Sequence, residues 1–259
     1  MREINVYGDT LPEAYHKALL QLNSLGEIND CGDWNTRCSE VGMTIKIGKP
    51  TMEPMISKLT NCGPRELEQY RMEMLDGILD FEIDKGNWKY TYHNRMVCYP
   101  NDDEIDGYTN QIEWVINELQ RNPSSRRACI MIRNAEDIGS DDPSCLQHMQ
   151  IQLRNGYLDL QVLFRSNDAV KACFMNMFAL ICLQKRIADI LGVKVGAYTH
   201  RVNNFHAYMR DFDTLEYYRR QIANSDIREL TYNYKGDWDE MMEEERIDIL
   251  RSVEELKKR

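Results

Sequence analysis

The chain has 259 residues, of which 42% are hydrophobic and 29% are charged, and its formal net charge is -10. These proportions are ordinary for a globular protein that buries one sizeable core. The negative charge argues against a general nucleic-acid-binding protein, because neutralising phosphates requires a basic surface. A few local arginines could still hold a single phosphate group.

The start of the sequence and its cysteines indicate a compartment. Residues 1–20 contain no long apolar run, so we expect neither a signal peptide nor a membrane span. The eight cysteines form no CxxC pair. This spacing favours reduced thiols in the cytoplasm over disulfides or a zinc site, and we expect no metal.

In the first half of the chain the patterns are mostly helical. Residues 11–26 predict an amphipathic helix with Pro12 near its start and Gly26 as its stop. Residues 42–50 predict a short strand, and residues 63–81 predict a helix with apolar positions at helical spacing. A further helix within residues 107–127 is expected to end at Asn122-Pro123.

The second half begins with strands. The patterns predict a strand at 126–134, a hairpin at 146–166 turning at 154–156, a buried helix at 174–192, and a strand followed by a helix from 193. Residues 235–259 predict a charged C-terminal helix, interpreted as a solvated surface face. This mixed order favours an α+β fold in a single domain spanning 1–259, with a mixed or mainly antiparallel sheet flanked by helices.

Cys145 is the candidate nucleophile among the cysteines. It lies between a polar turn and the predicted hairpin, and folding that hairpin brings Arg165 back towards it. A guanidinium beside a thiol favours the thiolate, which is the nucleophilic form. The pair therefore predicts covalent catalysis, whereas a cysteine alone would more often serve packing.

Five short motifs carry a family resemblance. They are "RNPSSRR" at 121–127, "PSC" at 143–145, "RSND" at 165–168, "MNMF" at 175–178 and "FHAY" at 205–208. In order and separation they resemble thymidylate synthases and the related pyrimidine nucleotide hydroxymethylases. The resemblance is strongest over residues 121–211 and has the character of the shorter archaeal and phage-type members.

The resemblance implies a reaction and its main residues. Cys145 would add to C6 of a pyrimidine nucleotide and so activate C5 as a nucleophile, with 5,10-methylenetetrahydrofolate as co-substrate. Arg165 and Ser166 would bind the phosphate, and Arg165 would also support the thiolate. Arg126 and Arg127 would reach into the neighbouring subunit's phosphate site, so a homodimer is implied.

The remaining implied roles concern the base, the sugar and the folate. Asn176 would read the base; its amide matches O4 and N3-H of uracil, which favours dUMP over a cytosine nucleotide. His206 and Tyr208 would bind the sugar 3'-hydroxyl, and Asp168 would organise the folate and ordered water. Gln150 would support the site, and Tyr92 would take part in removing the C5 proton. Arg37 would bind the phosphate.

The sequence also departs from the family pattern. Leu146 follows the nucleophile where many members have histidine, and "ACFM" at 172–175 replaces a Gly-x-Pro-Phe motif. The general-base glutamate stays open among Glu66, Glu68 and Glu73. The chain ends in "EELKKR" rather than in an apolar tail that would close over the folate, which eases the addition of water.

Three functions therefore remain open. The first is a thymidylate synthase that converts dUMP to dTMP by one-carbon transfer and reduction. The second is a hydroxymethylase of dUMP or a cytidine nucleotide, in which water rather than hydride ends the reaction. The third is a nucleotide-binding protein without catalysis.

Overall fold

The structure is a computed structural model that describes residues 1–258, apart from the side chain of Asp33. Arg259, the last residue of the predicted C-terminal helix, lies outside this description. One cluster of buried side chains runs from Leu11 in the first helix to Met242 in the last. No helix among the described residues is long and apolar enough to cross a membrane.

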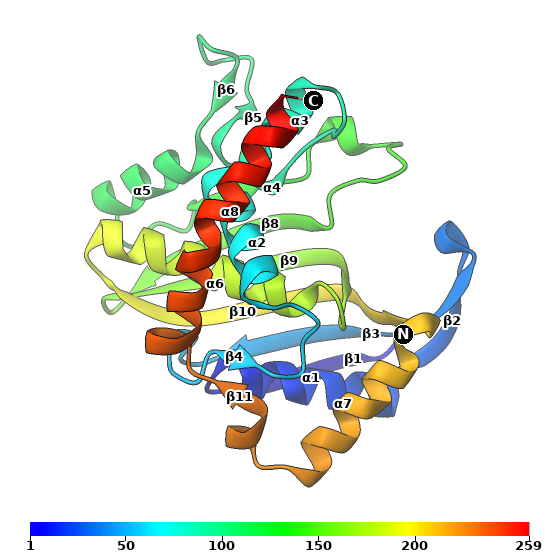
Figure 1. The fold of residues 1–259 in the computed structure, drawn as a ribbon. Helices are drawn as coiled ribbons and strands as arrows, with labels where there is room; N and C mark the ends of the chain where they lie inside the picture. Colours follow the sequence, from blue (N-terminus) through cyan, green and yellow to red (C-terminus); the bar gives the residue numbers. More distant parts are fainter. Residues whose placement is uncertain (259) are drawn as a thin grey trace.

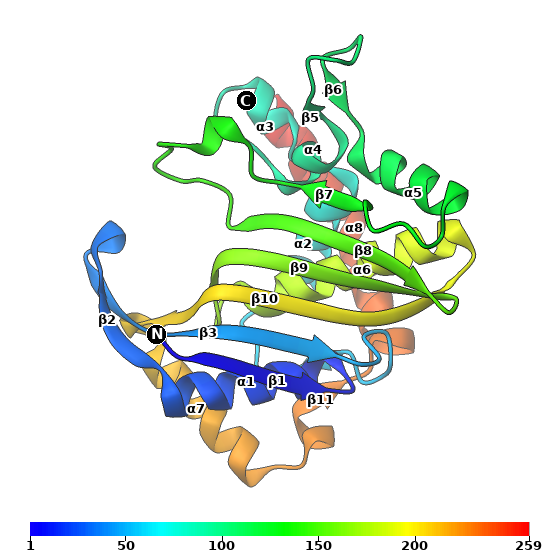
Figure 2. The same ribbon diagram turned by 180° about the vertical axis from the view of Figure 1, so that it is seen from behind.

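A seven-stranded mixed sheet forms the centre of the fold (Figures 1 and 2). Its strands are β1 (Glu3–Gly8), β2 (Glu27–Cys31), β3 (Thr36–Ile47), β7 (Cys129–Met131), β8 (Leu146–Arg154), β9 (Tyr157–Asp168) and β10 (Lys194–Tyr208). Their order is β1-β3-β10-β9-β8-β7, with β2 paired to β3. The pairs β1/β3 and β9/β10 are parallel and the others are antiparallel.

Eight α-helices are seen in the described residues. They are α1 (Leu11–Leu25), α2 (Pro64–Asp76), α3 (Phe81–Asp84), α4 (Tyr92–Val97), α5 (Gln111–Arg121), α6 (Cys173–Leu191), α7 (Phe212–Asn224) and α8 (Asp239–Lys257). Two small ribbons pair β4 (Ile56–Ser57) with β11 (Thr231–Tyr232), and β5 (Tyr99–Pro100) with β6 (Tyr108–Thr109).

The helices are gathered on one face of the sheet. Helices α1 and α6 pack on the strands, α2 packs on α6, and α8 packs on α2. The opposite face, seen in Figure 2, carries no helix among the described residues. Alternation along β9 agrees with this arrangement, because Leu160, Val162 and Phe164 are buried whereas Gln161 is exposed. The expected α+β fold with a mixed sheet flanked by helices is confirmed.

The hairpin and two of the helices follow the sequence prediction closely. Strands β8 and β9 meet at a two-residue turn in which Asn155 and Gly156 have φ values of 52° and 77°. Both residue types tolerate this left-handed region, which such a hairpin turn requires. Helix α6 ends at Gly192, also left-handed, and α1 ends at Leu25, one residue before Gly26.

Four expectations need correction. The short strand at 42–50 is part of the twelve-residue β3. The helix at 63–81 ends at Asp76, because Gly77 has a φ of 62° and reverses the chain before the separate α3. The segment after 193 stays in β10 as far as Tyr208. The charged C-terminal helix is more than a solvated face, since a buried stripe packs it on α2, comprising Met242, Ile249 and Val253.

The topology brings several chain segments to one edge of the sheet. Strands β9 and β10 are parallel and joined by α6, so their carboxyl ends meet at the same edge. The antiparallel neighbours place the start of β8 and the start of β3 at this edge as well. Cys145 immediately precedes β8, and the "RSND" and "FHAY" motifs end β9 and β10.

Candidate active site

A cavity of about 580 Å³ lies at this edge, and we call it the nucleotide cavity. It collects side chains from strand ends, from the start of α6 and from the β2–β3 hairpin. Eight of the twelve site residues expected from the sequence line it: Tyr92, Cys145, Arg165, Ser166, Asp168, Asn176, His206 and Tyr208.

The hairpin joins Cys145 to Arg165 as expected. The backbone N–H of Arg165 donates to the carbonyl of Cys145 at 2.8 Å. The guanidinium reaches back to the loop before the nucleophile, where Nη2 donates to Pro143 O at 2.7 Å and Nε donates to Ser144 O at 3.1 Å. Arg165 therefore fixes the backbone that carries the thiol, and Cys145 is half-buried in the cavity wall.

The thiol is less acidic than the sequence suggests. Burial raises the pKa of Cys145 above its ordinary value, Arg165 acts to lower that pKa, and Asp142 acts to raise it. The expected direction of the arginine's influence is thus right, but desolvation outweighs it. In the free protein Cys145 is mainly a thiol at neutral pH, so its proton must leave when it attacks.

His206 is poised to accept a hydrogen bond. Burial lowers the pKa of its ring, which keeps the imidazole neutral. Its Nδ1 lies 3.2 Å from the carbonyl of Asn204 and 3.3 Å from Ser166 Oγ, and a carbonyl can only accept. The proton therefore belongs on Nδ1, which leaves the buried and unpartnered Nε2 as an acceptor. Tyr208 packs edge-on against the ring at 4.7 Å.

Asn176 lies in the first turn of α6 and is buried. Its Oδ1 accepts a short hydrogen bond from the hydroxyl of Tyr70. No described side chain bonds its Nδ2, and that atom is not sealed from the cavity. The amide therefore presents a donor to the nucleotide cavity.

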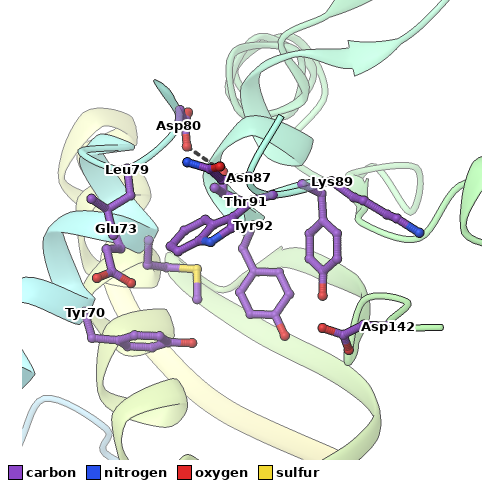
Figure 3. A pocket seen from close by; sticks show the side chains of 12 residues that line it. Tyr70, Glu73, Leu79, Asp80, Asn87, Lys89, Thr91, Tyr92 and Asp142 are labelled. Atoms are coloured by element: carbon purple, nitrogen blue, oxygen red, sulfur yellow. Dashed lines mark hydrogen bonds between the residues drawn. The ribbon is translucent and has the colours of Figure 1, made fainter. Parts of the chain in front are cut away.

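A second cavity of about 470 Å³ adjoins the first, and we call it the folate-side cavity. The two cavities share Tyr70, Tyr92 and Asp142. Figure 3 shows Tyr70 and Glu73 projecting from α2, with Tyr92 and Asp142 on the opposing wall. The other lining residues are divided equally between aromatic or apolar groups (Met74, Leu79, Trp88 and Tyr90) and polar or charged groups (Asp80, Asn87, Lys89 and Thr91).

The structure distinguishes the three candidate glutamates. Glu66 caps α2 by accepting from Gly63 N at 2.9 Å. Glu68 is fully buried, Arg71 of the same helix binds both of its carboxylate oxygens, and Arg246 of α8 lies 4.0 Å away. Only Glu73 lines a cavity, and burial raises the pKa of its carboxyl group. Glu73 is therefore the carboxylate of the three with access to bound substrates.

Tyr92 stands at the junction of the two cavities, at the start of α4. Its hydroxyl accepts from the backbone N–H of Leu146 at 3.3 Å, next to the nucleophile. Asp80 holds this segment, because its carboxylate binds Thr91 Oγ1 at 2.5 Å and His93 Nδ1 at 2.6 Å. The tyrosine is therefore anchored from both sides.

Four expected residues do not line either cavity. Arg37 is exposed and reaches Asp30 Oδ1 at 3.7 Å. Arg126 and Arg127 lie on the exposed link between α5 and β7, and Arg127 Nη2 binds Glu118 at 3.0 Å. Gln150 Nε2 donates to Ala128 O at 2.9 Å and to Arg126 O at 3.4 Å, so it holds that link in place.

Sequence reasoning missed several lining residues. Tyr70 falls among the apolar positions of the helix predicted at 63–81, yet a tyrosine three positions before Glu73 shares its helix face and lines both cavities. Asp142 lies in the polar turn that precedes Cys145, but the sequence gives it no expected role. Asn167 lies within the "RSND" motif without an expected role, and no signal pointed to Cys31, Cys38, Glu40 or Asn204 in the nucleotide cavity.

Comparison with known proteins agrees with this geometry. The thymidylate synthase family model matches residues 54–249. A putative thymidylate synthase of Methanocaldococcus jannaschii is 32% identical over 217 residues, covering 81% of this chain and 93% of that protein. A putative thymidylate synthase of Methanosarcina barkeri is 27% identical over 217 residues, covering 82% and 92%.

The bacterial relatives align over less of their length. The thymidylate synthase of Bacillus licheniformis is 30% identical over 161 residues, which is 62% of this chain but only 53% of that protein. Nearly full coverage of the archaeal proteins confirms the expected kinship with shorter members. The fold and the family match together define a one-carbon transferase. This chain belongs to the thymidylate synthase family.

Membership of this family has direct consequences. The chain is a methyltransferase whose co-substrate is 5,10-methylenetetrahydrofolate, and the family implies dUMP as nucleotide and a dimeric assembly. The names of these relatives favour the synthase over the hydroxymethylase. Among residues 1–258, no group of three or more histidine, cysteine or acidic side chains is arranged to hold a metal ion.

Proposed function

We propose that this chain converts dUMP to dTMP at the two adjoining cavities, with Cys145 as the nucleophile. The observation that carries the proposal is the position of Cys145. Cys145 lies in the nucleotide cavity, beside Arg165. Three residues that line this cavity, Tyr70, Tyr92 and Asp142, also line the folate-side cavity. That arrangement suits a reaction in which one carbon passes between two ligands held side by side.

The chemical role of Cys145 is covalent activation of the base. Sγ forms a bond to C6 of uracil, and the electron pair of the C5–C6 double bond moves towards C5 and O4. C5 thereby becomes the nucleophile for the one-carbon unit. Loss of the C5 proton would break the bond between the one-carbon unit and the folate nitrogen, a hydride from the folate would reduce that carbon to a methyl group, and the Sγ–C6 bond would break to release the thiolate, dTMP and dihydrofolate. Arg165 keeps the thiol in place through Pro143 and Ser144.

The nucleotide is held by groups at the ends of β9 and β10. Arg165 and Ser166 are the proposed phosphate ligands within this chain. His206, against whose ring Tyr208 packs edge-on, is the proposed partner of the sugar 3'-hydroxyl. At the base, Asn176 Nδ2 donates to O4 of uracil. Asp168 accepts from Val170 N and Lys171 N, which sets the turn into α6 and leaves a carboxylate at the cavity.

The folate-side cavity suits a flat, extended co-substrate. Trp88 and Tyr90 supply aromatic walls for a ring, and Met74 and Leu79 supply apolar contacts. When bound, the co-substrate supplies the one-carbon unit and the reducing hydride. Glu73 is the proposed general acid–base, since its carboxyl group lines the cavity and burial raises its pKa above the ordinary value. Tyr92, at the shared wall, is the proposed participant in removal of the C5 proton.

The arginine pair is proposed to act across the dimer. Arg126 and Arg127 lie outside both cavities of their own chain and are exposed, so both could reach a second copy, although Arg127 would first have to leave its ion pair with Glu118. The helix-free sheet face in Figure 2 is the proposed dimer surface. Gln150 supports the role by fixing the backbone at Arg126 and Ala128. Arg37 stays a predicted phosphate ligand that contacts only Asp30 here.

A mixed-dimer experiment tests this arrangement. Cys145→Ser and Arg126→Ala are each expected to be nearly inactive as homodimers. When the two are unfolded, mixed in equal amounts and refolded, activity should return to roughly a quarter of the wild-type value, because half of the dimers are mixed and each has one intact site. No recovery on mixing would place the arginine within its own subunit's chemistry.

The reaction itself is tested by product mass. The protein is incubated with 5,10-methylenetetrahydrofolate and, separately, with dUMP, dCMP and CMP, and the nucleotide products are weighed. We expect dTMP from dUMP together with dihydrofolate, seen as a rise in folate absorbance. A stable adduct with 5-fluoro-dUMP should form with wild type and not with Cys145→Ser.

Two other outcomes identify the alternatives. A 5-hydroxymethyl product with a flat absorbance trace would make the chain a hydroxymethylase. Nucleotide binding without any product, unchanged by Cys145→Ala, would make it a binding protein.

A further inference from the structure

Tyr70 and Asn176 form an isolated hydrogen-bonded pair between two helices. The phenol hydroxyl of Tyr70, on α2, donates to Asn176 Oδ1, on α6. Within the described residues, neither side chain has another hydrogen bond. Both line the nucleotide cavity, so this contact lies where the pyrimidine base is proposed to bind.

The hydrogen bond from the Tyr70 phenol determines which of its two orientations the Asn176 amide adopts. An asparagine has a donor end and an acceptor end, and rotation by 180° exchanges them at little cost in shape. Burial raises the pKa of Tyr70, so its hydroxyl stays protonated and needs an acceptor. Among residues 1–258, Asn176 Oδ1 is the one acceptor with which this hydroxyl forms a hydrogen bond. Rotating the amide would turn an N–H₂ group towards the phenol and leave the phenol's hydrogen without a partner.

We propose that Tyr70 is a specificity-determining positioning residue that holds Asn176 in the orientation that reads uracil and rejects cytosine. This inference rests on the proposed function of the same cavity. With the amide held, Nδ2 points into the cavity and donates to O4, while the second lone pair of Oδ1 accepts from N3–H. Cytosine presents an amino donor and an unprotonated N3 at these positions, so both contacts would be mismatched.

The cost of accepting cytosine therefore includes one broken hydrogen bond. To pair with a cytosine nucleotide, the amide must rotate, after which Nδ2 faces the phenol oxygen and the hydrogen of the Tyr70 hydroxyl loses its acceptor, Asn176 Oδ1. A net hydrogen bond of ordinary strength corresponds to about a two- to tenfold change in an equilibrium constant. Tyr70 is expected to contribute a factor of that size to the preference for dUMP over dCMP.

Binding measurements with Tyr70→Phe test the proposal. Dissociation constants for dUMP and for dCMP are measured by calorimetry in wild type and in the variant. The ratio of the two constants should move towards dCMP by about two- to tenfold. Tyr99→Phe is the matched control: it also removes one tyrosine hydrogen bond, to Arg133 O at 3.0 Å, but it lies outside both cavities and should leave the ratio unchanged.

A double-mutant cycle separates orientation from simple packing. A carboxyl group has no distinct nitrogen end, so in Asn176→Asp the addition of Tyr70→Phe should no longer shift the ratio. If wild type makes dTMP and Tyr70→Phe leaves the dUMP-to-dCMP ratio unaltered, the role of Tyr70 is wrong and the proposed function stands. If wild type neither binds nor converts dUMP, the proposed function fails, and the role of Tyr70 fails with it.

Discussion

The two adjoining cavities are built in different ways. The nucleotide cavity takes most of its functional groups from the ends of strands β9 and β10, and its residues fall in short motifs. The folate-side cavity takes its groups from α2 and from residues 79–92, which include loops and short helices. Strand pairing fixes which residues meet at a sheet edge, whereas a cavity between helices depends on packing across the whole chain.

The largest effect is expected on the nucleotide side, from Cys145→Ser. Without the thiol no bond forms to C6, and kcat/KM for dUMP should fall by at least about a thousandfold. Binding of dUMP itself should change little, because the phosphate and sugar contacts remain. Turnover and calorimetry together check this. Substantial residual turnover would remove the covalent step from the mechanism.

Glu73→Gln is expected to have the next largest effect, from the folate side. Loss of a general acid–base lowers kcat by about a hundredfold to a thousandfold, with a small change in KM for dUMP. A bell-shaped pH dependence of kcat in wild type should also lose one limb. Steady-state kinetics across pH 5 to 9 measure both effects.

Two neighbouring glutamates give matched controls for Glu73. Glu66→Gln removes a charged cap from α2 and should cost at most about 1 kcal/mol of stability, with kcat kept. Glu68→Gln disturbs a buried ion pair with Arg71 and should cost about 3 kcal/mol or more. Chemical denaturation measures both. If Glu66→Gln abolished turnover, the assignment of Glu73 would lose its basis.

Trp88→Ala should separate the two cavities most directly. It removes an aromatic wall of the folate-side cavity alone, so KM for the folate should rise by about tenfold while the dissociation constant for dUMP stays the same. His206→Gln is the reciprocal variant, expected to weaken dUMP binding and to leave the folate KM alone. Equal effects of both variants on both ligands would mean that the cavities act as one site.

The smallest effect is a pH dependence at Cys145. Because its pKa is raised above the ordinary thiol value, the thiolate fraction at neutral pH is small and rises about tenfold per pH unit. Alkylation of Cys145 by iodoacetamide, followed by peptide mass, should keep rising beyond pH 9. Arg165→Ala should slow alkylation at every pH in that range, since the arginine lowers the pKa. A plateau near pH 7 would show an acidic thiol instead.

The sequence predicted one cavity better than the other for a physical reason. The Asn155-Gly156 turn fixes the register of β8 and β9, so the meeting of Cys145 and Arg165 could be worked out along the chain. No such rule links Tyr70 with Asn176, 106 positions apart on two helices. The choice among Glu66, Glu68 and Glu73 likewise depended on which face of α2 is covered by α8.

Helix α2 is held between two different environments. Towards the cavities it presents Tyr70 and Glu73, while on its other side Glu68 is tied to Arg71 and lies 4.0 Å from Arg246 of α8. Helix α8 thus packs against and supports α2, which carries Tyr70 and Glu73, the residues proposed for base recognition and proton transfer. Substitutions at the contact between α2 and α8, far from any ligand, would alter the reaction by tilting α2.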